Sequence, residues 1–129
     1  MKALTPETIR PPFARYAHGI EIPSEYRIVQ TSGQLGIRAD DSIPESAYEQ
    51  AKLCFENILE ILKSANMMSS DVAHISAFVT GRDHMAGYMK ARDEFVGDQD
   101  RLPSSTLLIV SGFTREEFKV EVEVMAAAP

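Results

Sequence analysis

The chain has 129 residues, of which 44% are hydrophobic and 25% charged, and its formal net charge is −6. A chain of this size fits one domain, and this composition excludes a disordered, collagen-like or low-complexity protein. The acidic balance, without any run of Lys and Arg, argues against nucleic acid or an anionic membrane as a partner and favours a small molecule.

The first residues lack the apolar core of a signal peptide, and no apolar run is long enough for a membrane helix. The one cysteine, Cys54, cannot form a disulfide within the chain. We therefore expect a cytoplasmic protein that folds as a single domain over residues 1–129.

The N-terminal third is predicted to be extended. Residues 1–14 are rich in proline and should form an extended lead-in, with the ordered domain starting near residue 14. Segments 17–22 and 26–32 are predicted to be two strands that pair with each other as a hairpin. Gly33 then marks a bulge or a close approach of the backbone.

The middle third contains two predicted helices and a strand. Apolar residues recur every three or four positions from about Pro44 onward, which predicts a helix of about five turns. These residues are Ala47, Ala51, Cys54, Ile58, Leu62 and Ala65. Segment 71–80 is predicted to be a buried strand. Asp83 is a candidate cap for a second helix that runs to about Val96.

The C-terminal third is predicted to hold two strands, at 104–110 and 118–124, joined around Gly112. In the second strand, alternation places Phe118, Val120, Val122 and Val124 on one face and Lys119, Glu121 and Glu123 on the other. The element order ββαβαββ predicts an α+β fold, a two-layer sandwich with two helices on one face of a mixed sheet.

The other face of this sheet is expected to be covered by further copies of the chain. Residues 107–110 are apolar on both sides of their strand, and a monomer with one open sheet face would expose them. The pattern therefore indicates an oligomer.

Arg92 stands out because its position falls on the apolar stripe of the second helix, with Met85, Met89 and Phe95. A guanidinium in such a place needs a partner or a route to solvent. Two interpretations stay open: Arg92 binds the anionic group of a ligand, or it forms a structural ion pair. Arg15 and Arg101 are weaker candidates for the same anion-binding role.

Several short segments, in order along nearly the whole chain, carry a family resemblance. They are residues 16–19 (YAHG), 31–35 (TSGQL), 50–51 (QA), 57–58 (NI), 61–62 (IL), 71–72 (DV), 103–106 (PSST) and 119–123 (KVEVE), followed by Ala126. With these segments the chain resembles the YjgF-like (RidA) family of reactive-intermediate deaminases, which act on enamines and imines. It implies a chorismate-mutase-like fold and a trimer whose sheets form a central barrel. It also implies ligand clefts between subunits and no metal or organic cofactor.

The resemblance also implies a set of site residues. Glu121 matches a catalytic glutamate that directs water onto the C=N carbon, and Tyr16, Ser32 and Gly33 match cleft residues. Ser105 stands where the deaminases have an arginine that binds the substrate carboxylate. A serine offers neither the charge nor the paired donors of a guanidinium.

The resemblance thus leads to two hypotheses. The first is a hydrolytic deaminase of an enamine, an imine or a related small amine, with Glu121 as the catalytic residue and Tyr16, Ser32, Gly33, Arg92 and Ser105 as ligand-binding residues. The departure at Ser105 predicts weak turnover of simple imino acids. The second is a non-catalytic homotrimer that binds a small metabolite or a client protein. RNA cleavage, known among relatives, fits an acidic chain poorly. The three histidines and Cys54 show no metal-binding or nucleophile pattern, and Cys54 is expected to be inert core.

Overall fold

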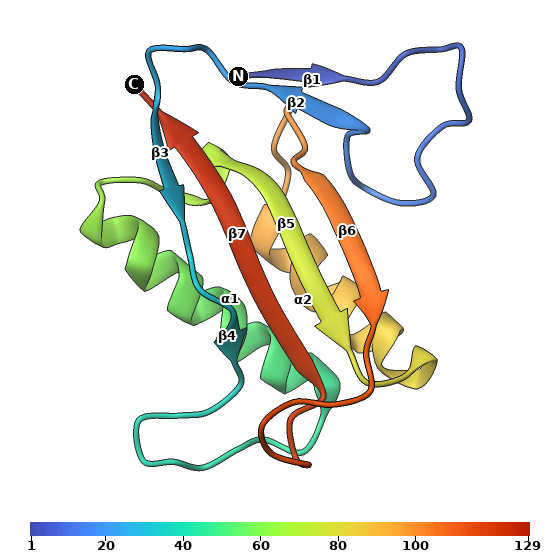
Figure 1. Ribbon diagram of the computed structural model, residues 1–129, viewed down its shortest axis with the longest axis vertical. Helices are drawn as coiled ribbons and strands as arrows, with labels where there is room; N and C mark the ends of the chain where they lie inside the picture. Colours follow the sequence, from blue (N-terminus) through green and yellow to red (C-terminus); the bar gives the residue numbers. More distant parts are fainter.

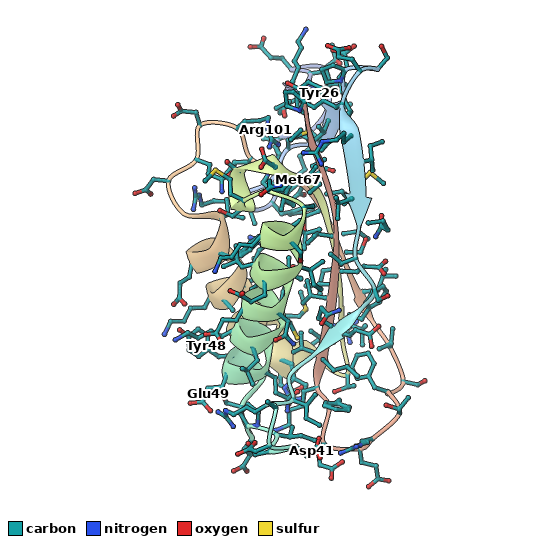
Figure 2. All side chains as sticks on the ribbon, turned by 90° about the vertical axis from the view of Figure 1, so that its left-hand side faces the viewer. Tyr26, Asp41, Tyr48, Glu49, Met67 and Arg101 are labelled. Atoms are coloured by element: carbon teal, nitrogen blue, oxygen red, sulfur yellow. The ribbon has the colours of Figure 1, made fainter.

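A computed structural model describes all residues 1–129. Helices α1 (Ala47–Ser64) and α2 (Met85–Val96) lie side by side against one face of a five-stranded sheet (Figure 1). Seen edge-on, the opposite face of the sheet carries no second layer (Figure 2). The predicted α+β class and the placement of both helices on one face are confirmed.

The main sheet is mixed. Its strand order is β3-β7-β5-β6, and the short β4 also pairs with β7. The strands are β3 (Arg27–Gln30), β4 (Gln34–Leu35), β5 (Val72–Val79), β6 (Ser104–Ile109) and β7 (Val120–Ala128). β5 and β6 run parallel, whereas every pairing with β7 is antiparallel. β6 therefore forms one edge of the sheet, and the long β7 lies near its centre.

The predicted N-terminal hairpin is wrong. β2 (Gly19–Glu21) pairs with β1 (Lys2–Leu4), a strand inside the predicted lead-in, and β3 pairs with the far end of β7. β7 continues to Ala128, beyond its alternating stretch, and its backbone there is the partner of β3. Local sequence patterns predict strands but carry little information about such long-range partners.

The two helices begin differently. Ser46 caps α1, and its hydroxyl accepts a hydrogen bond from Glu49 N at 3.1 Å, an interaction that typically contributes about 1 kcal/mol. Asp83 does not cap α2. It lies in a 3₁₀ turn, Arg82–His84, that leads into the helix, and α2 has no side-chain cap.

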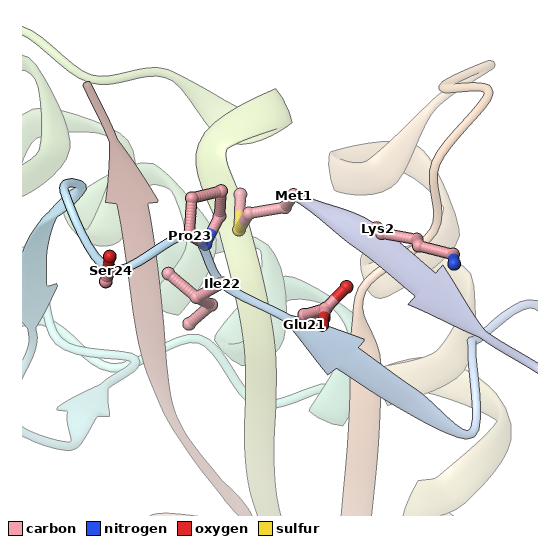
Figure 3. Close-up of a pocket in the computed structure, with 6 residues that line it drawn as sticks. All are labelled: Met1, Lys2, Glu21, Ile22, Pro23 and Ser24. Atoms are coloured by element: carbon pink, nitrogen blue, oxygen red, sulfur yellow. The ribbon is translucent and has the colours of Figure 1, made fainter.

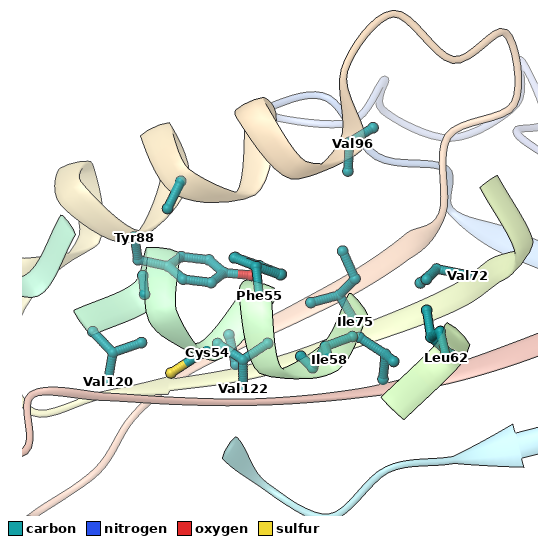
Figure 4. Close-up of a cluster of buried hydrophobic side chains, with 14 of the residues drawn as sticks. Cys54, Phe55, Ile58, Leu62, Val72, Ile75, Tyr88, Val96, Val120 and Val122 are labelled. Carbon is teal, nitrogen blue, oxygen red and sulfur yellow. The ribbon is translucent and has the colours of Figure 1, made fainter. Parts of the chain in front are cut away.

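The core lies between the helices and the sheet (Figure 4). Ile58 and Leu62 of α1 are fully buried, and Tyr88 of α2 stacks on Phe55 with 6.2 Å between ring centroids. The alternation in β7 is confirmed, because Phe118, Val120, Val122 and Val124 are buried and the charged residues between them are less so. Neither helix has the length and apolarity that crossing a membrane requires.

Candidate functional site

A pocket of about 420 Å³ lies beside the β6 edge of the sheet. Three of the predicted site residues line it: Tyr16 from the N-terminal segment, Arg92 from α2 and Ser105 from β6. The remaining lining residues are apolar, namely Phe13, Ala14, Met85, Met89 and Leu107. The structure thus brings together half of the predicted site and surrounds it with a mainly apolar wall.

A backbone bridge holds the N-terminal segment against β6. Ala17 forms an isolated parallel bridge with Ser104, and Ala17 N donates to Pro103 O at 2.9 Å. This contact places Tyr16 just beyond the edge strand. The Tyr16 hydroxyl accepts a hydrogen bond from Phe13 N at 3.2 Å, which fixes the turn that forms one wall of the pocket.

Arg92 is only 4% exposed, as the sequence pattern predicts for this position on α2. Its Nε and Nη2 donate to Asp93 Oδ1 at 3.2 and 3.0 Å. Arg92 therefore has the ion-pair partner that the structural interpretation expects, and it also lines the pocket. Its binding of a ligand anion stays a prediction. Arg15 donates to Gly97 O, and Arg101 donates to Ser70 O and Val72 O; neither lines the pocket.

The other predicted residues form a second group on the open face of the sheet. Glu121 on β7 pairs with Leu35 of β4, which follows Ser32 and Gly33 closely in the chain. A methyl group added at Gly33 would lie 2.2 Å from Glu121 Oε1, so the carboxylate rests against the Gly33 backbone. Ser32 is exposed.

The carboxyl of Glu121 forms no hydrogen bond within the chain, and partial burial raises its pKa above the ordinary value. The neighbouring charge of Glu123, two residues along the same face, raises the pKa further. Lys119 does not neutralise this pair, because its Nζ donates to Glu45 O. A carboxyl with a raised pKa and no hydrogen-bond partner is suited to act as a general base.

The two groups cannot reach the same ligand within one chain. Residues that pair across strands point to the same side of a sheet. Glu121 therefore shares the side of its partner Phe78, and Ser105 shares the opposite, helix-covered side of Ile75. Three residues and two strand spacings separate Glu121 from Ser105, about 10 Å along the strands and about 10 Å across them.

The rest of the molecule shows less functional chemistry. Another hollow, about 520 Å³, lies between the N-terminus and the end of β2 and contains none of the predicted site residues (Figure 3). His74 Nδ1 lies 2.7 Å from Ser104 Oγ on the open face. No three His, Cys, Asp or Glu side chains are grouped as metal ligands would be. Cys54 is fully buried, and burial raises its pKa to about 12.

Sequence reasoning missed most of the apolar wall. Met85 and Met89 match the apolar stripe of the second helix, a pattern that predicts inward-facing positions, and Phe13 lies in the predicted lead-in. The signal that could have found the pocket is Arg92 itself, because a charge inside an apolar stripe indicates that part of the stripe does not pack against the core.

Comparisons with known proteins agree over nearly the whole chain. The family model described as Endoribonuclease L-PSP matches residues 7–128. TdcF of Escherichia coli K12, which is named as a reactive intermediate deaminase, is 27% identical over 124 residues, 93% of each chain. The mitochondrial protein mmf2 of Schizosaccharomyces pombe is 24% identical over 102 residues, 78% of this chain and 79% of its own.

Solved structures show the same fold. A protein of the conserved Rid family, YyfB of Yersinia pestis, superimposes with a TM-score of 0.84 at 21% identity over 98% of both chains. E. coli TdcF, solved with bound serine, superimposes with a TM-score of 0.73 at 22% identity over the full length of both chains. The family match over residues 7–128, together with these relatives, shows that the chain belongs to the YjgF/RidA-like family.

Proposed function

We propose that the chain is a hydrolytic deaminase of a reactive enamine or imine, which acts in clefts between the subunits of a homotrimer. The observation that carries the proposal is the separation of the two groups of residues. Glu121 lies on the open face in contact with Gly33, and the pocket of Tyr16, Arg92 and Ser105 lies beyond β6. A cleft between two copies joins the open face of one to the pocket of the other.

Two surfaces support association of the copies. Leu108 and Ile109 on the edge strand β6 are 50% and 46% exposed, and Ile28 on β3 is 59% exposed. An unpaired edge strand with exposed apolar side chains favours contact with another chain. Light scattering at micromolar concentration should give three times the 14.3 kDa chain mass. A stable monomer contradicts the trimer and the shared cleft.

The chemistry follows from a carboxylate next to an apolar pocket. Glu121 takes a proton from water as the water oxygen adds to the C=N carbon. The imine nitrogen receives a proton in turn. The hydroxyl proton of the resulting carbinolamine then passes to its nitrogen as the C–N bond breaks, which forms the carbonyl and releases ammonia. An enamine enters the same path after protonation to the imine. The hydroxyls of Tyr16 and Ser105 lie in the pocket wall and are available to orient the substrate.

A complementation experiment tests the shared cleft. Glu121→Gln removes the proton-exchanging group, and Ser105→Phe fills the pocket with a ring. Each variant alone should release no ammonia from an imine. After unfolding together and refolding, mixed trimers should recover about a quarter of wild-type turnover, because random assembly leaves about one cleft in four with both residues intact.

The recovery of turnover in mixed trimers distinguishes a cleft shared between subunits from a site within one chain. A site within one chain predicts no recovery, because every chain carries one defect. Thermal melting checks that both variants fold, and Met89→Trp serves as a second way to fill the pocket. If the wild-type trimer binds keto acids but releases no ammonia from imines, the proposed deaminase activity is excluded.

The alternative is a trimer that binds a small metabolite or a client protein without turnover. Ser105 favours it, because the carboxylate-binding arginine of the deaminases is missing there. RNA cleavage has weaker support, because the net charge is −6 and the pocket contains a single cation, Arg92. Incubation with labelled RNA provides the direct check.

A further inference from the structure

The pocket beside β6 has one charged group, Arg92, in a mainly apolar wall that also contains Tyr16 and Ser105. We propose that Arg92 binds the carboxylate of a substrate that carries a sizeable apolar side chain. The anion-binding role thus moves from the strand position held by Ser105 to helix α2. This inference rests on the proposed function in that the substrate occupies this pocket.

The guanidinium of Arg92 has unused donors. An arginine side chain carries five N–H donors, and the hydrogen bonds of Arg92 are the two from Nε and Nη2 to Asp93 Oδ1. Nη1 has no acceptor in the chain, and it reaches solvent although the residue as a whole is only 4% exposed. These accessible donors face the pocket, and a ligand carboxylate provides acceptors that match them.

Asp93 holds the guanidinium without occupying its free edge. Asp93 follows Arg92 directly in α2, and one of its oxygens receives both hydrogen bonds, on the Nε and Nη2 side. Its side chain is 41% exposed, so water solvates the rest of the carboxylate. This contact fixes the plane of the guanidinium and leaves Nη1, with the second hydrogen of Nη2, for an incoming anion.

The remaining wall selects for an apolar body. Met85, Met89 and Leu107 are half-buried, and Phe13, which is 81% exposed, borders the pocket from the N-terminal segment. The pocket volume of about 420 Å³ lies in the range of small-molecule sites. A three-carbon acid would fill only part of it. Methionine side chains adapt to ligands of different shape. A substrate with a larger aliphatic or aromatic side chain therefore covers the apolar wall of the pocket. A substrate whose side chain is only a methyl group leaves most of that wall uncovered.

Calorimetric titration with product keto acids tests both parts. The keto acid of leucine should bind wild-type protein more tightly than pyruvate does. Arg92→Met should weaken that binding at least about tenfold, which is the usual loss for one charge-assisted hydrogen bond. Methyl isobutyl ketone, in which a methyl group replaces the carboxylate, should bind weakly and equally to both proteins.

Lys90→Met is the matched control, because it removes the same charge from the exposed side of the same helix. It should leave the affinity unchanged. Arg92→Met should keep its melting temperature within a few degrees, since the half-exposed Asp93 can turn to solvent. Arg92→Lys, which keeps the charge but loses the forked geometry, should give an intermediate affinity.

Equal affinity of wild type and Arg92→Met for the keto acid of leucine overturns the role of Arg92. Equal affinity of pyruvate and that keto acid overturns the apolar selection. Both measurements are binding affinities and do not depend on turnover. A protein that never releases ammonia can therefore still support the proposed role of Arg92 and the apolar selection. Conversely, Glu121→Gln should abolish ammonia release while keeping keto acid binding, and that result concerns only the deaminase.

Discussion

Glu121 and Gly33 are in direct contact, because the carboxylate occupies the space in which any larger residue at position 33 would place its Cβ. The approach would be 2.2 Å, so one of the two groups must move when a side chain is added. The far end of a glutamate is flexible and should move first. Gly33 therefore sets the position of the catalytic carboxylate in the proposed reaction.

Gly33→Ala should lower ammonia release strongly while the melting temperature changes little, because the carboxylate is displaced and the fold is kept. Steady-state turnover and calorimetric melting measure the two effects. Gly112→Ala is the control, since its Cβ would meet no atom within 4 Å. Full activity in Gly33→Ala contradicts a positioning role for Gly33.

Glu123→Gln should lower the pKa of Glu121, because Glu123 is one of two causes that raise it. The acidic limb of the pH–rate profile should therefore shift to lower pH. Glu56→Gln, an exposed change on α1, should leave the profile unchanged. An unshifted limb in Glu123→Gln shows that this limb does not report Glu121.

The same pair affects stability. A carboxyl whose pKa is raised in the folded state stabilises the protein below its unfolded pKa, about 4.3 for glutamate, and this contribution is lost as pH rises through the folded pKa. Glu121→Gln should therefore raise the melting temperature at neutral pH. The gain should vanish below about pH 4, where both states are protonated. A gain that is independent of pH contradicts the proposed ionisation.

Leu108→Lys should disrupt assembly and leave the subunit folded, because Leu108 is half exposed on the edge strand and lies outside the core. Light scattering should show a fall from three times 14.3 kDa towards the single chain. Met68→Lys, at a residue that is 62% exposed in the connection between α1 and β5, should remain assembled. An intact Leu108→Lys trimer means that another surface joins the copies.

Cys54 should be unreactive in the native protein. Its thiol is fully buried, donates to Gln34 O at 3.0 Å, and has its pKa raised by burial to about 12. Ellman's reagent at about pH 8 should detect no thiol before denaturation and one per chain afterwards. Rapid native labelling contradicts the assignment of Cys54 to the core.

Much of the fold follows from periodicity. The three- and four-residue spacing predicts α1 correctly because one face of that helix packs on the sheet, and the alternation in β7 predicts which side chains are buried. Asp83 was expected to cap α2, yet the chain enters that helix through a 3₁₀ turn. Local rules describe helix faces well because the contacts that they reflect are local.

The strand partners show what local rules cannot supply. Segments 17–22 and 26–32 read as a hairpin because they are neighbours in sequence, but backbone hydrogen bonds join β2 to β1 and β3 to the end of β7. Any two extended segments offer the same backbone donors and acceptors. The choice between partners depends on which arrangement buries most apolar surface in the whole chain.

The same distinction between local patterns and long-range contacts applies to the candidate site. Residue type and spacing indicate the fold class, the buried face of β7 and the anomaly of Arg92, and the family resemblance indicates the departure at Ser105. The fold was needed to show that Tyr16, Arg92 and Ser105 line one pocket while Glu121 and Gly33 lie on the other face of the sheet. Strand order and register set that division, and both arise from contacts between residues far apart in the chain.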